Sequence, residues 1–309
     1  MQCFARPAKA LLPLAAALGV LTVPTLALAD CATLDGEVRA AMAAGEIGRY
    51  HGLHRSVLAE PTCDSDYRAR LGRVLALSAL KSLAANTKSA AREPTVEELE
   101  SLRRLAEPWQ LMVSLGDAYY DARDWAKAFK AYEAALDDMR DEKANPSAPP
   151  ASLERHAYQR AVQARALAPT FIASRSVRGA PSGLASPRFR NFTAVAVPVP
   201  VRFAYNSSAL TPEGEAAARE ILEYLKSQNA KSVRLIGHTD PVGSEPFNLE
   251  LSAARAEAVK NFLAQNGYDG AIEIVPRGEA ELFQPDDPGG YSREELHVMY
   301  RRVEYQLVE

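Results

Sequence analysis

A positively charged side chain interrupts an otherwise apolar helix face in the second half of this 309-residue sequence. The helix is predicted to begin near Pro246, and the residues along one side of it are Leu251, Arg255, Val259 and Phe262. A buried cation without a partner is costly, so this guanidinium must reach solvent, pair with a carboxylate or bind an anionic ligand. Spacing alone favours a structural ion pair and leaves the ligand as the alternative.

A carboxylate lies close to this arginine in the sequence. Asp240 follows the strand-like segment SVRLIG (232–237), in a loop with proline and glycine that leads into the helix of Arg255. Loops on a rigid scaffold often carry ligand-binding side chains. A cation and an anion held a few ångströms apart can bind a zwitterion, so we predict Arg255 and Asp240 as such a pair.

The sequence lacks the side-chain sets that catalysis requires. His238 lies near Asp240, yet no nucleophile motif such as GxSxG accompanies them. His51 and His54 share a predicted helix face without a third metal ligand, and the glycines of DPGGY (287–291) lack the lysine of a phosphate loop. We predict no catalytic residues, no metal and no cofactor, and hence a binding protein, not an enzyme.

The elements that position this pair follow an α+β order. Thr211 before Pro212 is a good helix start, and SREE (292–295) is typical of a capping box that begins a short last helix. Strands are predicted at 197–205, 232–237, 271–275 and 302–308, and longer helices at 212–228 and 246–265.

Three segments of this half resemble the OmpA-like peptidoglycan-binding domain. GHTDPVGSEPFNLELSAARAEAVKNFL (237–263) is similar to the signature of that family, and FAYNSSALTPEG (203–214) and RRVEYQL (301–307) match it in the right order. The resemblance covers about 197–308. It implies a mixed sheet packed on helices and a noncovalent grip on peptidoglycan stem peptides at diaminopimelate, whose far end carries an ammonium and a carboxylate.

The resemblance also implies roles for individual residues. Arg255 matches the carboxylate-binding arginine of the family and Asp240 its paired aspartate; a guanidinium suits a carboxylate bidentately, and the aspartate can accept from the ammonium. Four more residues match positions around the pocket, each with a purely structural role as its alternative: Asn206, Thr239, Asn248 and Arg302. Tyr300 stands where the family usually has asparagine, a departure in the local pocket wall.

The first half of the chain is helical in character. In LGDAYYDARDWAKAFKAYEAAL (115–136), small and aromatic residues recur at Leu115, Gly116, Tyr119, Ala128, Tyr132 and Ala135. This spacing predicts a helical hairpin that turns near Asp124, and it resembles a tetratricopeptide repeat.

One repeat cannot bury its own face, so neighbouring helices are expected. Weaker hairpins are predicted at 34–60 and 67–83, and a closing helix at 151–167 after the loop NPSAPP (145–150). The fold class is therefore an all-α, repeat-like domain followed by an α+β OmpA-like domain. The helical array is expected to bind a protein partner; an ordinary helical bundle is the alternative.

The first 29 residues have the composition of a secretory signal peptide. Arg6 and Lys9 precede an apolar run, and the small residues Ala27 and Ala29 allow cleavage before Asp30. An uncleaved anchor is the alternative, and Cys31 makes a lipoprotein a third option. The predicted organisation is a signal peptide at 1–29, a helical domain at 30–168, a linker at 169–191 and an OmpA-like domain at 192–309.

Cleavage would leave two cysteines, Cys31 and Cys63, in a compartment that permits oxidation. A turn at Gly45 between two helices would return Cys63 near Cys31, so we predict a disulfide, with free thiols as the alternative.

The formal charge of −3 falls by two, to −5, when Arg6 and Lys9 are removed, and this argues against nucleic acid as a partner. No later segment is long and apolar enough to cross a bilayer.

The signal-like segment and the resemblance to the OmpA-like family together imply a protein of the Gram-negative periplasm that binds peptidoglycan and anchors itself or an envelope assembly to the cell wall, with the outer membrane as a further location. The alternative is a helical scaffold for a protein partner, tethered by the wall-binding domain.

Overall fold

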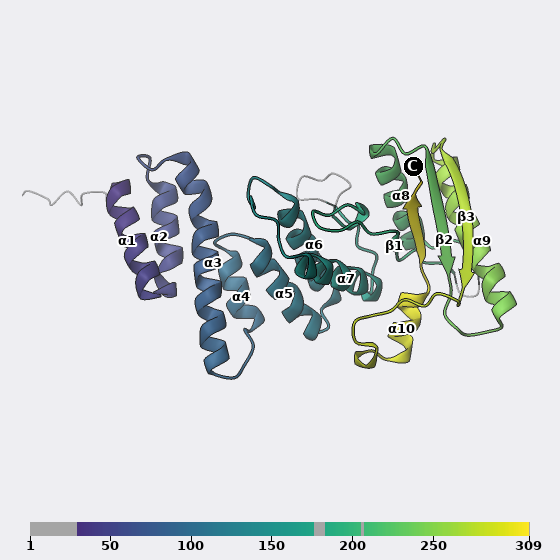
Figure 1. The fold of residues 1–309 in the computed structure, drawn as a ribbon, viewed down its shortest axis with the longest axis horizontal. Helices are drawn as coiled ribbons and strands as arrows, with labels where there is room; N and C mark the ends of the chain where they lie inside the picture. The colour runs from purple at the N-terminus through teal and green to yellow at the C-terminus, as the bar shows by residue number, and fades with distance from the viewer. Residues whose placement is uncertain (1–29, 176–182, 205–206, 309) are drawn as a thin grey trace, which may run out of the picture.

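The amino-terminal half of the chain consists of helices (Figure 1). The computed structural model describes residues 30–175, 183–204 and 207–308. The predicted signal peptide and Asn206 lie outside these residues. The helical half is formed by α1 Cys31–Ala44, α2 Ile47–Ala59, α3 Ser65–Ser89, α4 Val96–Arg103, α5 Trp109–Asp121, α6 Trp125–Arg140 and α7 Ala151–Leu167.

A mixed sheet forms the centre of the second half. Its strands are β1 Val197–Val199, β2 Ser232–His238, β3 Ala271–Gly278 and β4 Val303–Leu307, in the order β1-β4-β2-β3. β4 runs antiparallel to β1 and β2, whereas β2 and β3 are parallel and need a crossover helix. The structure thus confirms the predicted fold class of a helical region followed by a mixed sheet on helices.

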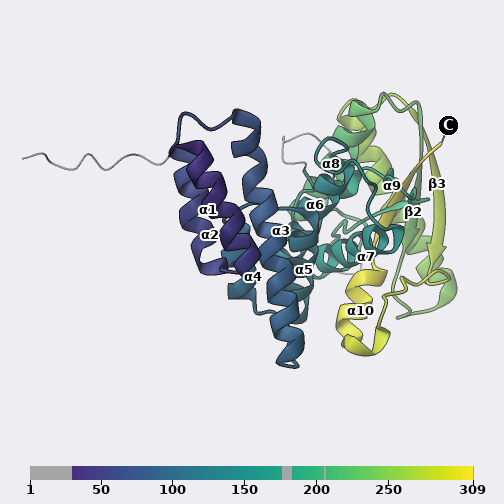
Figure 2. The same ribbon diagram turned by 60° about the vertical axis from the view of Figure 1, so that its left-hand side comes forward.

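Two helices cover one face of this sheet, α8 Pro212–Ser227 and α9 Glu245–Gln265 (Figure 2). Alternate strand residues such as Leu235 and Val303 are fully buried with Ile221 of α8 and Val259 of α9. The opposite face is polar and carries the Arg234–Glu273 ion pair. The short helix α10 Arg293–Tyr300 begins with the predicted capping box, in which Ser292 and Glu295 exchange hydrogen bonds.

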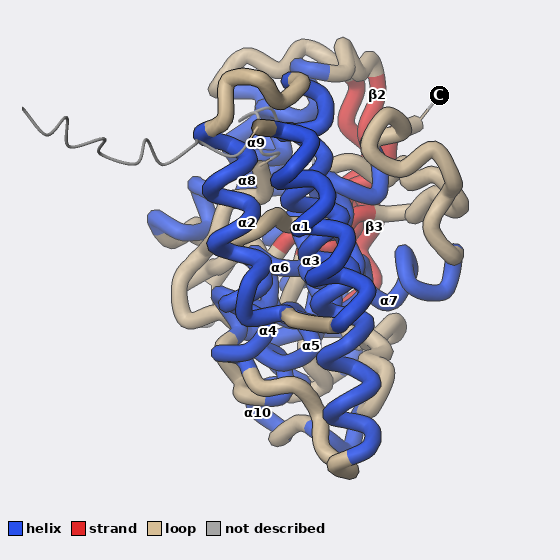
Figure 3. Tube along the Cα trace, turned by 90° about the vertical axis from the view of Figure 1, so that its left-hand side faces the viewer, coloured by secondary structure: helices blue, strands red, loops and turns tan. Residues whose placement is uncertain are grey.

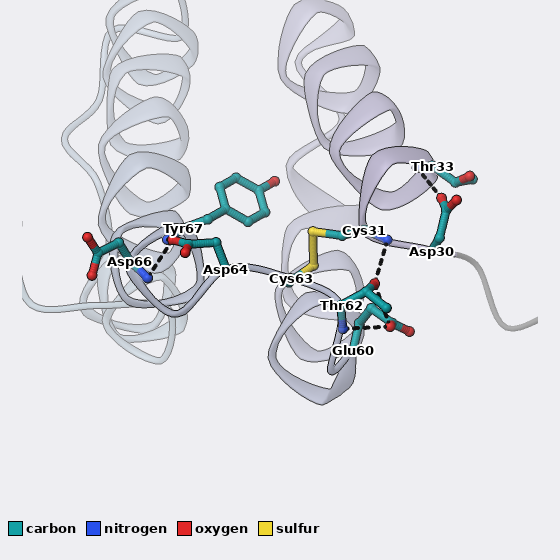
Figure 4. Close-up of a disulfide and its surroundings, with 9 residues drawn as sticks. All are labelled: Asp30, Cys31, Thr33, Glu60, Thr62, Cys63, Asp64, Asp66 and Tyr67. Carbon is teal, nitrogen blue, oxygen red and sulfur yellow. Dashed lines mark hydrogen bonds between the residues drawn. A yellow bond between two sulfur atoms is a disulfide. The ribbon is translucent and has the colours of Figure 1, made fainter.

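The first two helices form the predicted hairpin, closed by a disulfide between Cys31 and Cys63 (Figures 3 and 4). The two Cα atoms lie 4.9 Å apart. Asp30 caps α1 by accepting from the Thr33 amide at 2.8 Å, and the Cys31 amide donates to Thr62 Oγ1 at 3.2 Å. The covalent link therefore fastens the start of α1 to the segment that leads into α3.

The prediction of a hairpin at 67–83 is wrong, because this stretch lies inside the continuous 25-residue helix α3. Asp64 caps its start through the amides of Asp66 and Tyr67, and no proline or left-handed residue interrupts it. The short helix α4, which follows, packs its buried Leu99 and Leu102 into the common core.

Helices α5 and α6 form the predicted hairpin around Asp124, which accepts from the Lys127 amide at 3.2 Å. A Cβ on Gly116 would lie 2.5 Å from the ring of Tyr132, so glycine is what lets α6 approach this closely. Residues 145–150 form the predicted loop, and α7 spans the predicted 151–167. The resemblance to a tetratricopeptide repeat stays a prediction.

The segment predicted as a linker packs against both halves in its described residues. Leu184 and Ala185 are buried, and Phe189 stacks on Phe192 with ring centroids 4.4 Å apart. The hydroxyl of Tyr305 on β4 donates to the Ala185 carbonyl. Within the described part of the chain, no helix has the length and apolar character needed to cross a membrane.

Candidate ligand-binding site

The site lies where β2 ends against α9. A Cβ on Gly237 would lie 2.2 Å from the Ser252 carbonyl oxygen, so the strand can approach the helix only because position 237 is glycine. Ser252 is fully buried, and its hydroxyl accepts from the Gly278 amide at 3.0 Å. This contact fixes the end of β3 to the same turn of α9. Arg255 follows Ser252 by three residues and therefore faces the loop that begins at Thr239.

A cavity of about 510 Å³ opens at this junction. Four predicted site residues line it: Thr239, Asp240, Asn248 and Arg255. The remaining lining residues are Phe203, Ala204, Val242, Phe247, Leu251, Glu294, His297 and Arg301. The formal charges of the cavity balance, because two arginines line it together with the two carboxylates Asp240 and Glu294. Val242 and Phe247 are exposed and form an apolar rim at its mouth.

Arg255 is buried in this cavity, with 8% of its surface exposed. Its Nε donates to the Ser207 carbonyl at 3.3 Å, and its guanidinium lies over the ring of Phe203, 5.1 Å from the centroid. Burial lowers the pKa of the guanidinium, and nearby Arg301 lowers it further while Asp240 raises it. Among the described residues no carboxylate forms a salt bridge with Arg255, and neither Nη atom has a hydrogen-bond acceptor.

Asp240 is joined to a second arginine, Arg301, which is not among the predicted site residues. Its Oδ2 accepts from Arg301 Nη1 at 2.7 Å, and its Oδ1 accepts from the Val242 amide at 3.0 Å. Arg301 also donates to Glu294 at 3.0 Å. The cavity thus presents two guanidinium groups and one oriented carboxylate, a set that suits a ligand with both an ammonium and a carboxylate.

Thr239 and Asn248 line the same cavity but differ in their contacts. The Thr239 amide donates to the Gly278 carbonyl at 2.8 Å, while its buried hydroxyl has no partner among the described residues. The side-chain amide of Asn248 donates to Glu279. Asn248 therefore holds the start of α9 against the loop after β3.

Arg302 lies outside this cavity. Its Nε donates to Glu304 at 2.7 Å, and its Nη2 donates to the Glu281 carbonyl at 3.3 Å. Burial alone would raise the pKa of Glu304, but His238 and Arg302 lower it to about 2. The structure therefore gives Arg302 contacts that hold β4 in place. Tyr300 is not among the lining residues of the cavity either.

The sequence held one signal for Arg301. The closing motif RRVEYQL contains two adjacent arginines, and only the second is a predicted site residue. Arg301 is the cap residue just after α10, whereas Arg302 comes directly before β4. Which of the two reaches the cavity depends on how α10 is docked, and neighbouring sequence does not reveal that.

No metal centre accompanies these groups in the described residues, where no three His, Cys, Asp or Glu side chains are gathered to hold an ion. A nucleophile paired with a base is also missing from the residues that line the cavity.

Comparisons with known proteins agree with the predicted family. Residues 202–294 match the family model described as the OmpA family. Outer membrane protein A of Serratia odorifera is 40% identical over 93 residues, which are 29% of this chain and 38% of that protein. Outer membrane protein A of Bordetella avium is 28% identical over 106 residues, which are 34% of this chain and 53% of that protein.

Part of the chain also matches solved structures. The peptidoglycan-associated lipoprotein from Burkholderia pseudomallei is 28% identical, and the match covers 35% of this chain and 86% of that one with a TM-score of 0.28. The chain spans about two fifths to one half of the curated relatives named above, and the family-model match lies in its second half. The family-model match at residues 202–294 shows that the carboxyl-terminal part of this chain contains an OmpA-like domain.

Proposed function

We propose that the OmpA-like domain binds peptidoglycan noncovalently and anchors this protein, or the envelope assembly that contains it, to the cell wall. The observation that carries the proposal is the buried guanidinium of Arg255, which has no described carboxylate partner and shares a cavity with Asp240. Such an arrangement leaves a buried cation whose desolvation an anionic ligand would offset.

The ligand group that fits is the zwitterionic end of diaminopimelate. Its carboxylate would accept from the free Nη groups of Arg255, and its ammonium would donate to Asp240. The Arg301 contact occupies one oxygen of Asp240 at 2.7 Å, which orients the carboxylate and leaves acceptor capacity for the ammonium. A lysine-type stem lacks the extra carboxylate and would leave Arg255 without a partner.

Location and organisation follow from the same proposal. The curated relatives are outer membrane proteins by name, which supports an envelope location for this chain. We further propose a periplasmic, non-catalytic protein with a cleaved signal at 1–29, a helical domain at 30–168, a linker at 169–191 and the wall-binding domain at 192–309. Protein binding by the helical half stays a prediction.

Co-sedimentation with purified diaminopimelate-type sacculi tests the function. Wild-type protein should pellet with the sacculi, and Arg255→Ala should stay in the supernatant. Arg234→Ala is the matched control, because Arg234 pairs with Glu273 on the polar face of the sheet, away from the cavity. Sedimentation of Arg255→Ala at the wild-type level, with circular dichroism showing that it is folded, would contradict the proposal.

A further inference from the structure

A second cavity lies between the helical half and the OmpA-like domain, and we name it the junction cavity. It has a volume of about 460 Å³. The end of α7 and the residues just after it, 166–169, form one wall, and the segment 200–203 with parts of α8, α9 and α10 forms the others. Three residues line both this cavity and the ligand cavity: Phe203, Arg255 and Arg301. The two cavities therefore meet at the same pair of arginines.

The charge of the junction cavity differs from that of the ligand cavity. Arg202, Arg255 and Arg301 line it, and Glu213 is the one carboxylate among its described lining residues. Because Arg301 already pairs with Asp240 and Glu294, Arg202 and Arg255 opposite Glu213 leave a formal excess of one positive charge. The ligand cavity is balanced, with two charges of each sign. A zwitterionic group suits the ligand cavity, whereas the junction cavity favours a group that is purely anionic.

The helical half holds one of these arginines in place. Arg202 donates through Nη1 to the Pro169 carbonyl at 2.7 Å and through Nη2 to the Ala168 carbonyl at 2.5 Å. These carbonyls follow the last turn of α7, so Arg202 joins the end of α7 to the OmpA-like domain. Arg255, by contrast, uses only its Nε within the described residues, which leaves its Nη groups available to a ligand.

We propose that the junction cavity is a second subsite, which binds a further carboxylate of the same peptide whose zwitterionic end occupies the ligand cavity. The inference rests on the proposed function and deepens it. The ligand class is a peptide with at least two free carboxylates, one beside an ammonium and one without. The helical half then lines one side of the binding site and contributes directly to peptidoglycan binding.

Two synthetic stem peptides test this subsite by isothermal titration of the full mature protein. Both keep the zwitterionic end of diaminopimelate, and they differ only in whether the remaining α-carboxylates are free or amidated. Wild-type protein should bind the amidated peptide about tenfold more weakly, which corresponds to the loss of one charge-assisted contact. Equal affinity for the two peptides would overturn the second subsite and leave the proposed function intact.

A charge variant gives an independent measurement. Glu213→Gln removes the negative charge of the junction cavity and should bind the free-carboxylate peptide several-fold more tightly, with no gain for the amidated peptide. Glu215→Gln is its matched control, because Glu215 lies in the same first turn of α8 but is exposed and does not line the cavity. An equal gain for both peptides, or for both variants, would contradict the subsite. If neither peptide binds wild-type protein, both the second subsite and the proposed function are overturned.

Discussion

Arg165 of α7 and Glu220 of α8 form a salt bridge of 2.5 Å across the boundary between the helical half and the OmpA-like domain, with 1% and 4% of their side chains exposed. Glu220 also accepts from the Ser174 amide at 2.7 Å, and the Arg165 guanidinium lies over Phe171, 4.9 Å from the ring centroid. A buried ion pair with these extra contacts ties the two halves together through specific geometry.

Replacing Arg165 with methionine should destabilise the protein strongly. The variant leaves Glu220 buried without its cation, which typically costs about 3 to 5 kcal/mol. Chemical denaturation measures the loss. Arg39→Met is the control, since Arg39 pairs with Asp35 on the surface and is 78% exposed, so its effect should stay within about 0.5 kcal/mol. Equal and small effects for the two variants would show that the halves are not coupled through Arg165.

The disulfide should stabilise the amino-terminal hairpin measurably. Cys31 and Cys63 are 32 positions apart, and the chain-entropy model gives about 3 to 4 kcal/mol for a loop of that size. Thiol counting on denatured, unreduced mature protein should find no free thiol, and reduction should lower the denaturation midpoint. The Cys31→Ser/Cys63→Ser variant should show no response to reductant; a response there, or two free thiols in the wild type, would be contrary to this account.

Acid should destabilise the OmpA-like domain through Glu304. Its pKa is lowered from 4.5 to about 2, so the stabilisation is present above pH 4.5 and is lost as the pH falls towards 2. The slope from this one group is at most about 1.4 kcal/mol per pH unit. Urea denaturation at several pH values should show a shallower acid slope for Glu304→Gln than for wild type. An unchanged slope would mean that Glu304 does not titrate as its contacts with His238 and Arg302 require.

The two neighbouring arginines should separate into a binding residue and a stability residue. Arg301→Ala removes the cation beside Asp240 in the ligand cavity and should weaken peptide binding about tenfold, while stability changes little because Arg301 is 35% exposed. Arg302→Ala breaks the contact with Glu304 and should lower stability while the affinity of the remaining folded protein is kept. The reverse pattern would restore Arg302 as the ligand-binding residue.

Local patterns predicted most of the elements because their causes are local. The helix at 151–167 starts after a proline-rich loop, and the capping box at Ser292 needs only four consecutive residues. The hairpin predicted at 67–83 is wrong because its local pattern contains no signal for a turn. The stretch has no proline, and its one glycine, Gly72, is a buried residue of the helix, so the hydrophobic spacing continues as one helix.

The site was only partly predictable, because its remaining contacts depend on packing between distant segments. Asp240 and Arg255 lie in one strand-loop-helix unit, so their pairing could be predicted from their closeness in the sequence. Arg301, by contrast, contacts Asp240 across 61 positions. In the sequence, Arg165 is an ordinary basic residue in the last turn of a helix, and its partner Glu220 is 55 positions away. The junction cavity exists only because α7 docks on the sheet half.

The most direct test of the central claim is a titration of wild type and Arg255→Ala with a diaminopimelate stem peptide and its lysine counterpart. Wild type should prefer the diaminopimelate peptide, and Arg255→Ala should lose about 2 to 5 kcal/mol of binding free energy towards it, tenfold in affinity for each 1.4 kcal/mol. The variant should also bind the two peptides almost equally, because the extra carboxylate no longer finds its guanidinium. If folded Arg255→Ala keeps the wild-type affinity and preference, then Arg255 does not bind the ligand carboxylate and the account is contradicted.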